Sequence, residues 1–204
     1  LIGVGVVIAC LMLITLSIGK LYQNWDDDPD RGAIAIKNGA MNEDYSTPLY
    51  LEQGWSNADS LWFYNTTQGS NLMPYDLFMA LEQADSEELF RSDALIDKYR
   101  YLPQKPTFFN PDGLPVGFVK DHYDGKNYIG YTCAACHTGQ VNYQGQAVRI
   151  DGGPAMADMV GFLKALGLAM RTTLNKPAKL ERFVERVIAR GGDFKKKDDV
   201  IASL

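Results

Sequence analysis

The chain has 204 residues, of which 46% are hydrophobic and 11% aromatic, so it is long enough to bury a hydrophobic core of its own. Its formal net charge of −5 argues against a nucleic-acid partner, because proteins that bind nucleic acids usually present a basic face. We predict three consecutive parts: a membrane anchor over residues 1–22, an extended irregular segment over 23–72, and a compact domain over 73–204.

The anchor is predicted from an uncharged apolar stretch at the start of the chain. Residues 1–19 contain no charged side chain, and Thr15 and Ser17 are the only polar ones. A helix of that length nearly spans a hydrocarbon core about 30 Å thick. Tyr22 and Trp25 follow at the height where aromatic side chains gather at a membrane interface.

Two alternatives exist for this stretch. A signal peptide usually has a shorter apolar region of about 7–15 residues and is cleaved after small residues. Residues 7–10 look like a lipoprotein cleavage box ending at Cys10, but residues 11–18 stay apolar after it, which a lipoprotein does not need. We therefore favour an uncleaved single span, with Cys10 as a small apolar side chain within it.

The middle of the chain gives weaker signals. Residues 26–72 lack a persistent helical period, so we expect an extended segment that wraps over the compact domain, with a short helical turn over 59–64. Apolar spacing predicts a helix over 75–84, and Ser86 with two following glutamates favours the start of another. Prolines exclude regular structure over 103–116.

Residues 133–137 read Cys-Ala-Ala-Cys-His, which is the attachment signature of a c-type haem. On a helix, Cys133, Cys136 and His137 stand at positions i, i+3 and i+4, so their side chains share one face. The two thiols can bond the two vinyl groups of a haem, while the imidazole reaches the iron as an axial ligand. The sequence therefore predicts one covalent haem c held by these three residues.

Other uses of a C-x-x-C pair fit this chain less well. A thioredoxin-like redox pair needs a βαβ context, which is not visible around the motif. A structural zinc site needs four ligands, and only Cys10 and His122 remain as a further cysteine and histidine. A disulfide between Cys133 and Cys136 leaves the adjacent His137 unexplained.

After the motif, the alternation of apolar and polar residues over 140–150 predicts a small β-hairpin. A turn at 151–154 leads into a long helix over about 155–174. Pro177 opens a last helix, which Gly191 ends. The charged tail that follows is expected to be a solvated segment.

The second axial position of the iron decides between two kinds of chemistry. A methionine or a second histidine closes the site for electron transfer, whereas an open position admits peroxide or dioxygen. Met156 is the preferred sixth ligand, because it follows a Gly-Gly-Pro turn that can aim it. Met159 and Met170 lie on an apolar helix stripe, where core packing is the commoner role, and His122 is expected at the surface.

Several strings beyond the motif are distinctive between residue 55 and about 170: L-W-F-Y-N-T-T-Q-G-S at 61–70, P-Y-D at 74–76, L-E-Q at 81–83, G-L-P-V-G-F at 113–118, G-Y-T-C-A-A-C-H-T-G at 130–139 and R-I-D-G-G-P-A at 149–155. On these strings the chain resembles the bacterial di-haem cytochrome c peroxidase-like family, and within it the rubber-oxygenase-related branch. In that family two haem domains cooperate. This sequence contains one C-x-x-C-H and looks like the first haem domain.

The resemblance implies a mainly α fold: a cytochrome-c-like haem domain over 73–204 with long irregular segments, a small β-hairpin and one N-terminal transmembrane helix. It also implies that Cys133 and Cys136 hold the porphyrin and that His137 is the proximal ligand. We expect either a membrane-anchored c-type cytochrome that transfers electrons to a redox partner protein on a larger membrane complex, or the N-terminal haem domain of a di-haem peroxidase or oxygenase. A third reading makes the haem a structural staple of an accessory subunit.

Haem c is attached outside the cytoplasm in bacteria. We therefore expect a single pass through the inner membrane, with the haem domain on the periplasmic side and the N-terminus inside.

Overall fold

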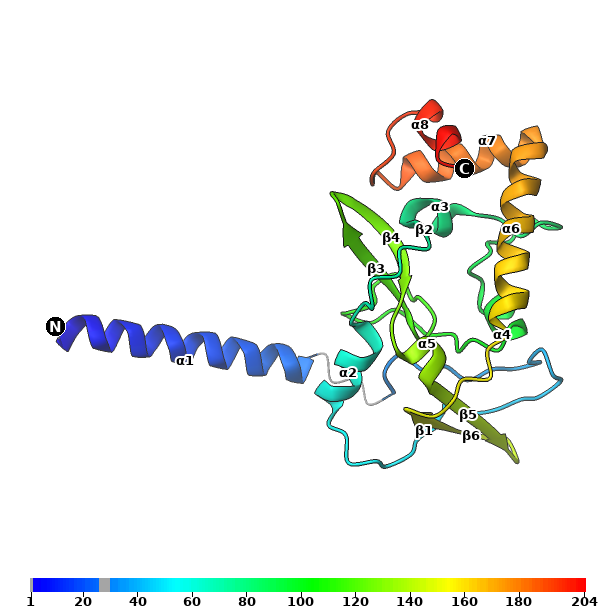
Figure 1. Cartoon of the computed structure of the whole chain (residues 1–204). Helices are drawn as coiled ribbons and strands as arrows, with labels where there is room; N and C mark the ends of the chain where they lie inside the picture. The colour runs from blue at the N-terminus through cyan, green and yellow to red at the C-terminus, as the bar shows by residue number, and fades with distance from the viewer. Residues whose placement is uncertain (1, 26–29) are drawn as a thin grey trace.

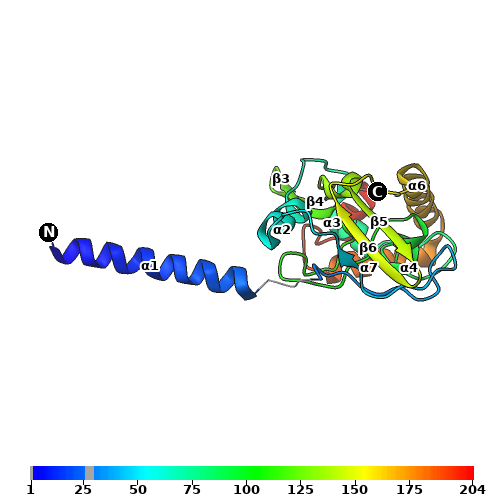
Figure 2. The ribbon, with the colours of Figure 1, turned by 90° about the horizontal axis from the view of Figure 1, so that it is seen from below.

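A computed structural model describes residues 2–25 and 30–204 (Figure 1). The first helix, α1 (Ile2–Trp25), stands apart from the other elements in both ribbon views (Figures 1 and 2). Its window from Gly3 to Lys20 has a mean hydropathy of 2.1 and no buried residue, so α1 is long and apolar enough to cross a membrane. The side chains of Tyr22 and Trp25, predicted for the interface, lie outside the described part of the structure.

Two small sheets flank the short helix α5 (Ala134–His137), which contains most of the haem motif. The first is antiparallel and has the strand order β2 (Met73–Pro74), β4 (Lys126–Tyr131), β3 (Phe118–Tyr123). The second has the order β1 (Leu49–Tyr50), β6 (Gln146–Asp151), β5 (Thr138–Tyr143), with β1 parallel to β6. The chain therefore enters α5 from one hairpin and leaves it into another, so both ends of the helix are held by sheet structure.

The expectation of a mainly α, cytochrome-c-like fold is wrong, because helices here combine with two three-stranded sheets. The hairpin predicted over 140–150 is present as β5–β6, but the β3–β4 hairpin was not expected. Asp124 and Gly125 join β3 to β4 with φ of +49° and +73°, and Gln144 and Gly145 join β5 to β6 with φ of +48° and +79°. Paired positive φ values form the two-residue turn that matches the twist of adjacent strands.

The other helices are α2 (Asn57–Asn65), α3 (Tyr75–Ala80), α4 (Asp93–Lys98), α6 (Met159–Asn175), α7 (Pro177–Ala189) and α8 (Lys197–Ala202). The helix expected after Ser86 begins only at Asp93, because Ser92 supplies the N-cap by accepting a hydrogen bond from the amide of Leu95. α2 extends the predicted turn, whereas α3 is shorter than its predicted range and α8 was not expected. The region 103–116 contains no helix or named strand, as predicted.

Residues 30–53 contain no helix and lie along the second sheet. Ser46 donates its amide hydrogen to the carbonyl of Gly145 at 3.0 Å, and Leu51 donates to the carbonyl of Arg149 at 2.9 Å. The segment covers the Arg149 side chain, which is 1% exposed. The sheet therefore has one face buried by a part of the chain that comes before the compact domain.

A buried carboxylate attaches α7 to the loop after α3. Glu82 is 1% exposed, and its oxygens accept hydrogen bonds from Lys179 at 2.9 Å, Arg182 at 2.8 Å and Arg186 at 2.8 Å. Burial alone would raise the pKa of Glu82, but the hydrogen bonds from Arg182 and Lys179 outweigh it and lower the pKa to about 2. The carboxylate is therefore ionised and paired throughout the physiological range.

Replacing Glu82 with Gln removes this charge and should lower the free energy of unfolding by about 3 kcal/mol at neutral pH. Because the folded pKa lies below the unfolded value near 4.5, the contribution is complete above about pH 4.5 and is lost as the pH falls toward 2. Urea unfolding across this range should therefore give a shallower acid dependence for Glu82→Gln than for the wild type.

Glu87→Gln is the matched control. The Glu87 side chain is 73% exposed and pairs with Arg182 at 3.4 Å, so its loss should cost less than about 1 kcal/mol. Equal destabilisation by both variants would contradict the role given to Glu82.

Candidate functional site

α5 presents the three motif side chains on its exposed side. Cys133, Cys136 and His137 are exposed, whereas Ala134 and Ala135 are buried at 1% and 3% exposure. Both thiols are free, so no disulfide joins them in this structure. The amide of His137 donates to the carbonyl of Cys133 at 3.0 Å, which closes the turn. The helical spacing thus places both sulfurs and the imidazole on one accessible face.

Backbone contacts hold the C-terminal end of this turn and its underside. Gly152 donates its amide hydrogen to the carbonyl of His137 at 2.7 Å, and Ala155 donates to the carbonyl of Cys136 at 2.9 Å. These bonds satisfy carbonyls that a helix end leaves without a partner inside the helix. Beneath the turn, a Cβ on Gly117 would overlap the backbone nitrogen and Cα of Ala135. Gly117 also has a φ of +83°, so glycine is required there twice over.

A buried aromatic group lies next to Cys136. The hydroxyls of Tyr101 and Tyr131 are 3.3 Å apart, and the ring of Phe118 lies 5.0 Å from each tyrosine ring. Burial raises the pKa of both tyrosine hydroxyls, and the hydrogen bond to Tyr131 raises the pKa of Tyr101 further. Both phenols are therefore neutral, and the motif stands at the edge of an uncharged aromatic core.

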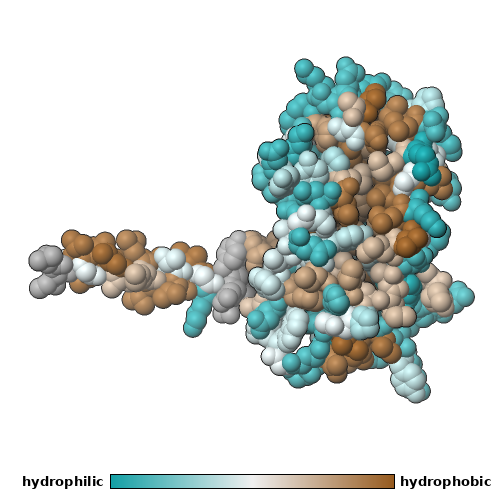
Figure 3. Space-filling view, in the orientation of Figure 1, coloured by the Kyte–Doolittle hydropathy of each residue, from teal (hydrophilic) through white to brown (hydrophobic). Residues whose placement is uncertain are grey.

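Figure 3 shows hydrophobic side chains gathered in a band between the β3–β4 hairpin and α6, above α5. Along α6 and the loop before it, Met156, Val160 and Leu163 are 71%, 62% and 42% exposed. A contiguous exposed apolar surface marks a binding site more often than a free surface. A porphyrin is a broad apolar ring, so two free thiols and an imidazole on a domain with an exposed apolar surface are a donor set that fits haem.

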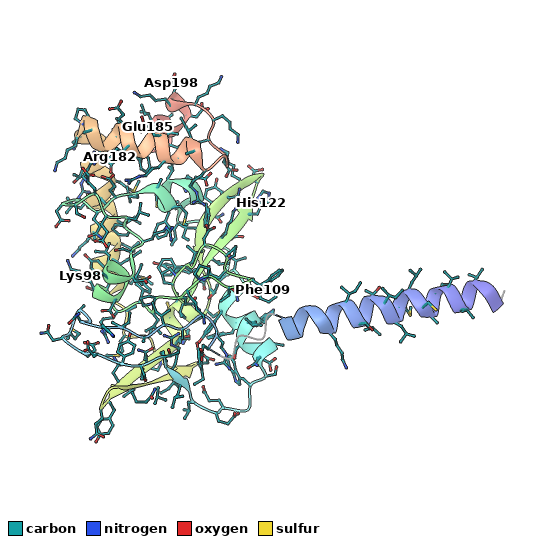
Figure 4. The ribbon with its side chains drawn as sticks, turned by 180° about the vertical axis from the view of Figure 1, so that it is seen from behind. Lys98, Phe109, His122, Arg182, Glu185 and Asp198 are labelled. Atoms are coloured by element: carbon teal, nitrogen blue, oxygen red, sulfur yellow. The ribbon has the colours of Figure 1, made fainter. Side chains whose placement is uncertain are left out.

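The sixth-ligand candidates occupy different places. Met156 follows Ala155, whose amide is bonded to the motif, and its side chain is exposed. Met159 and Met170 pack against the core, as predicted. His122 is exposed near the end of the β3–β4 hairpin, with its Nδ1 3.2 Å from Oδ1 of Asn127 (Figure 4). Of these four residues, Met156 combines exposure with a position beside the motif.

Arg149 and Asp151, which are chemically able to bind a propionate or move protons, belong to a buried polar network. Arg149 donates to Oε1 of Gln140 at 2.8 Å and to the hydroxyl of Tyr50 at 3.3 Å. Asp151 accepts a hydrogen bond from the hydroxyl of Tyr64 at 2.5 Å. Burial raises the pKa of Tyr64 well above its usual value, and the nearby Asp151 carboxylate contributes to the increase. These side chains join the second sheet to the segment that covers it.

Within the described ranges, no group of three or more His, Cys, Asp or Glu side chains is arranged to hold a metal ion by itself. The donors of α5 are two thiols and one imidazole on a single turn, which suits a covalently tethered ring more than a bare ion.

The close contact under α5 gives a direct test. Gly117→Ala should lower the free energy of unfolding by about 3 kcal/mol, because a methyl group would overlap Ala135 and the left-handed backbone is also disfavoured. Gly125→Ala is the control, since Gly125 has a φ of +73° but open space around its Cβ position, so only about 1 kcal/mol is expected. Chemical denaturation measures both, and similar losses would argue against the steric contact.

An uncharacterized protein from Sinorhizobium fredii, y4iJ, is 35% identical over 168 residues, covering 72% of this chain and 27% of that protein. No family model matches the chain, and no solved structure matches it. The chain therefore spans about a quarter of the length of the curated relative that it matches.

Proposed function

We propose that the chain is a membrane-anchored c-type cytochrome that transfers electrons through one covalently bound haem. The observation that carries this proposal is the exposure of Cys133, Cys136 and His137 on a turn whose two alanines are buried. Reactive or ligating side chains on one face, with a packed back, are what a thioether-linked ring requires.

Each residue has a defined role in this proposal. Cys133 and Cys136 would form thioether bonds to the porphyrin, and His137 would bind the iron from the proximal side. Met156 is the proposed sixth ligand. The bound haem supplies one-electron redox chemistry, while Gly117 and the 152–155 backbone fix the turn that presents the donors.

The location follows from α1 and the haem together. α1 is long and apolar enough to span a membrane. Because haem c is attached outside the cytoplasm in bacteria, we place the domain on the periplasmic side of the inner membrane. A redox partner protein, on a larger membrane complex, would exchange electrons with it.

A second candidate is the N-terminal haem domain of a di-haem peroxidase- or oxygenase-like enzyme. The support for this candidate is the resemblance of the strings between residue 55 and about 170, including C-A-A-C-H at 133–137, to the di-haem family. This candidate differs chemically from the first, because its iron would need an open or displaceable sixth position.

Covalent attachment is tested by removing the thiols. The double variant Cys133→Ala/Cys136→Ala should retain no haem after denaturing electrophoresis and haem staining, whereas Cys10→Ala should stain like the wild type. A pyridine haemochrome assay on the wild type should show covalently held haem. Its absence from protein produced with a working c-type maturation system would end this proposal.

The sixth ligand separates the two candidates. If Met156 binds the iron, Met156→Ala should convert the ferric absorption spectrum from low spin to high spin and lower the reduction potential. Met159→Ala should change neither, since Met159 packs against the core. A wild-type protein that is already high spin, and whose spectrum shifts with cyanide, would favour the enzyme candidate.

A further inference from the structure

α2, which carries exposed aromatic side chains, lies beside the point where the described chain resumes after the anchor, at residues 30–31. That point is tied to α2 through Asp151, whose Oδ2 lies 3.4 Å from Nη1 of Arg31. The same carboxylate accepts hydrogen bonds from Tyr64 at 2.5 Å and Ser60 at 3.4 Å, both on the buried side of α2. α2 is therefore fixed beside the residues that follow the anchor.

The opposite side of α2 is exposed and aromatic. Trp62 is 69% exposed, and Trp55, just before the helix, is 39% exposed. The ring of Trp55 meets that of Phe63 edge-on at 5.2 Å, which keeps Trp55 against the helix. A capping box between Ser56 and Asp59 sets the start of α2.

The loop after α4 brings another aromatic side chain to the same side of the molecule. Lys105 donates its amide hydrogen to the carbonyl of Gly32 at 2.8 Å, and Gln104 donates its side-chain amide to the carbonyl of Arg31 at 2.7 Å. Phe109, farther along this loop, is 46% exposed and lies on the side of the molecule where α2 and the end of α1 are found (Figure 4). Figures 1 and 2 both place α2 on the side from which α1 departs.

The length of the chain limits how far this side can lie from a membrane. The apolar window of α1 ends at Lys20, and the helix ends at Trp25. At about 3.6 Å per residue at most, the distance from Trp25 to Asp30 cannot exceed about 18 Å. If α1 spans a bilayer, Asp30 and its neighbours are therefore within reach of the lipid headgroups.

We propose that the aromatic face formed by Trp55, Trp62 and Phe109 rests in the phospholipid headgroup layer of the membrane that α1 crosses. Tryptophan is enriched at this depth because its ring is largely apolar while its N–H can bond to water or headgroups. The face lies on the side of the molecule from which α1 departs, which distinguishes it from the exposed apolar surface near α6. The domain is then held at the membrane both by α1 and by this aromatic face.

This orientation would also fix the haem motif relative to the bilayer. Tyr64, on the buried side of α2, packs in one cluster with Val116 and with Ala134 of α5. α2 therefore lies between the lipid and the back of the motif turn.

Photo-crosslinking of the full chain in phosphatidylcholine vesicles tests the contact. The photoreactive residue p-benzoylphenylalanine replaces Trp62, and the vesicles contain a tritiated phosphatidylcholine. Tyr143 is the matched control position, because it is 70% exposed and ends β5 at the hairpin turn, away from α2. We expect at least ten times more lipid label at position 62 than at position 143, and a similar excess at position 109.

Equal lipid labelling at positions 62 and 143 would overturn the proposal. Crosslinking of position 62 to another polypeptide instead of lipid would overturn it too, because the face would then be a protein interface. The phosphatidylcholine carries no net charge, so labelling cannot result from electrostatic attraction. The test does not involve haem, so its failure would leave the cytochrome proposal untouched, and a protein without haem could still pass it.

Discussion

The structure depends on how closely the chain packs beneath α5. With no side chain, Gly117 allows the β3–β4 hairpin to approach Ala135 at a distance that a methyl group would prevent. The amides of Gly152 and Ala155 then donate hydrogen bonds to the carbonyls at the C-terminal end of the same turn. Because its alanines are packed and its C-terminal carbonyls are hydrogen-bonded, the turn from Cys133 to His137 can expose three chemically active side chains while its own position stays fixed. A four-residue helix has little stability of its own, so this support comes from tertiary contacts.

Local chemistry determined which features the sequence could predict. The motif, the limits of α7 and the β5–β6 hairpin depend on neighbouring residues, and each was predicted. The β3–β4 hairpin was not predicted, although Asp124-Gly125 is a strong turn signal. α4 was placed too early because Ser86 and Ser92 are both acceptable caps, and only the packing of Leu95 and Ile96 into the core selects the second.

Long-range contacts were beyond prediction for a different reason. Nothing in the sequence near Glu82 indicates that three cations some hundred residues later will surround it. Likewise Arg149 could be read as a surface residue, yet it is buried because residues 30–53 cover its sheet. The contact of Gly117 with Ala135 and the pairing of Tyr101 with Tyr131 could not be predicted either, because each depends on which separate segments of the chain meet. These residues stabilise the fold and hold the motif turn in position, whereas the side chains of the motif determine which chemistry is available.

The two faces around α5 can serve different partners because α5 and α2 share one small cluster. Tyr64 turns inward toward Ala134, while Trp62, two positions away on α2, turns outward. The thiols and His137 are exposed on the turn whose two alanines are buried. If lipid covers the first face and the motif residues hold a haem, then α2 would lie between the bilayer and the motif turn. A tethered electron carrier needs that arrangement, since the membrane restricts its rotation and its partner must meet the haem without first displacing lipid.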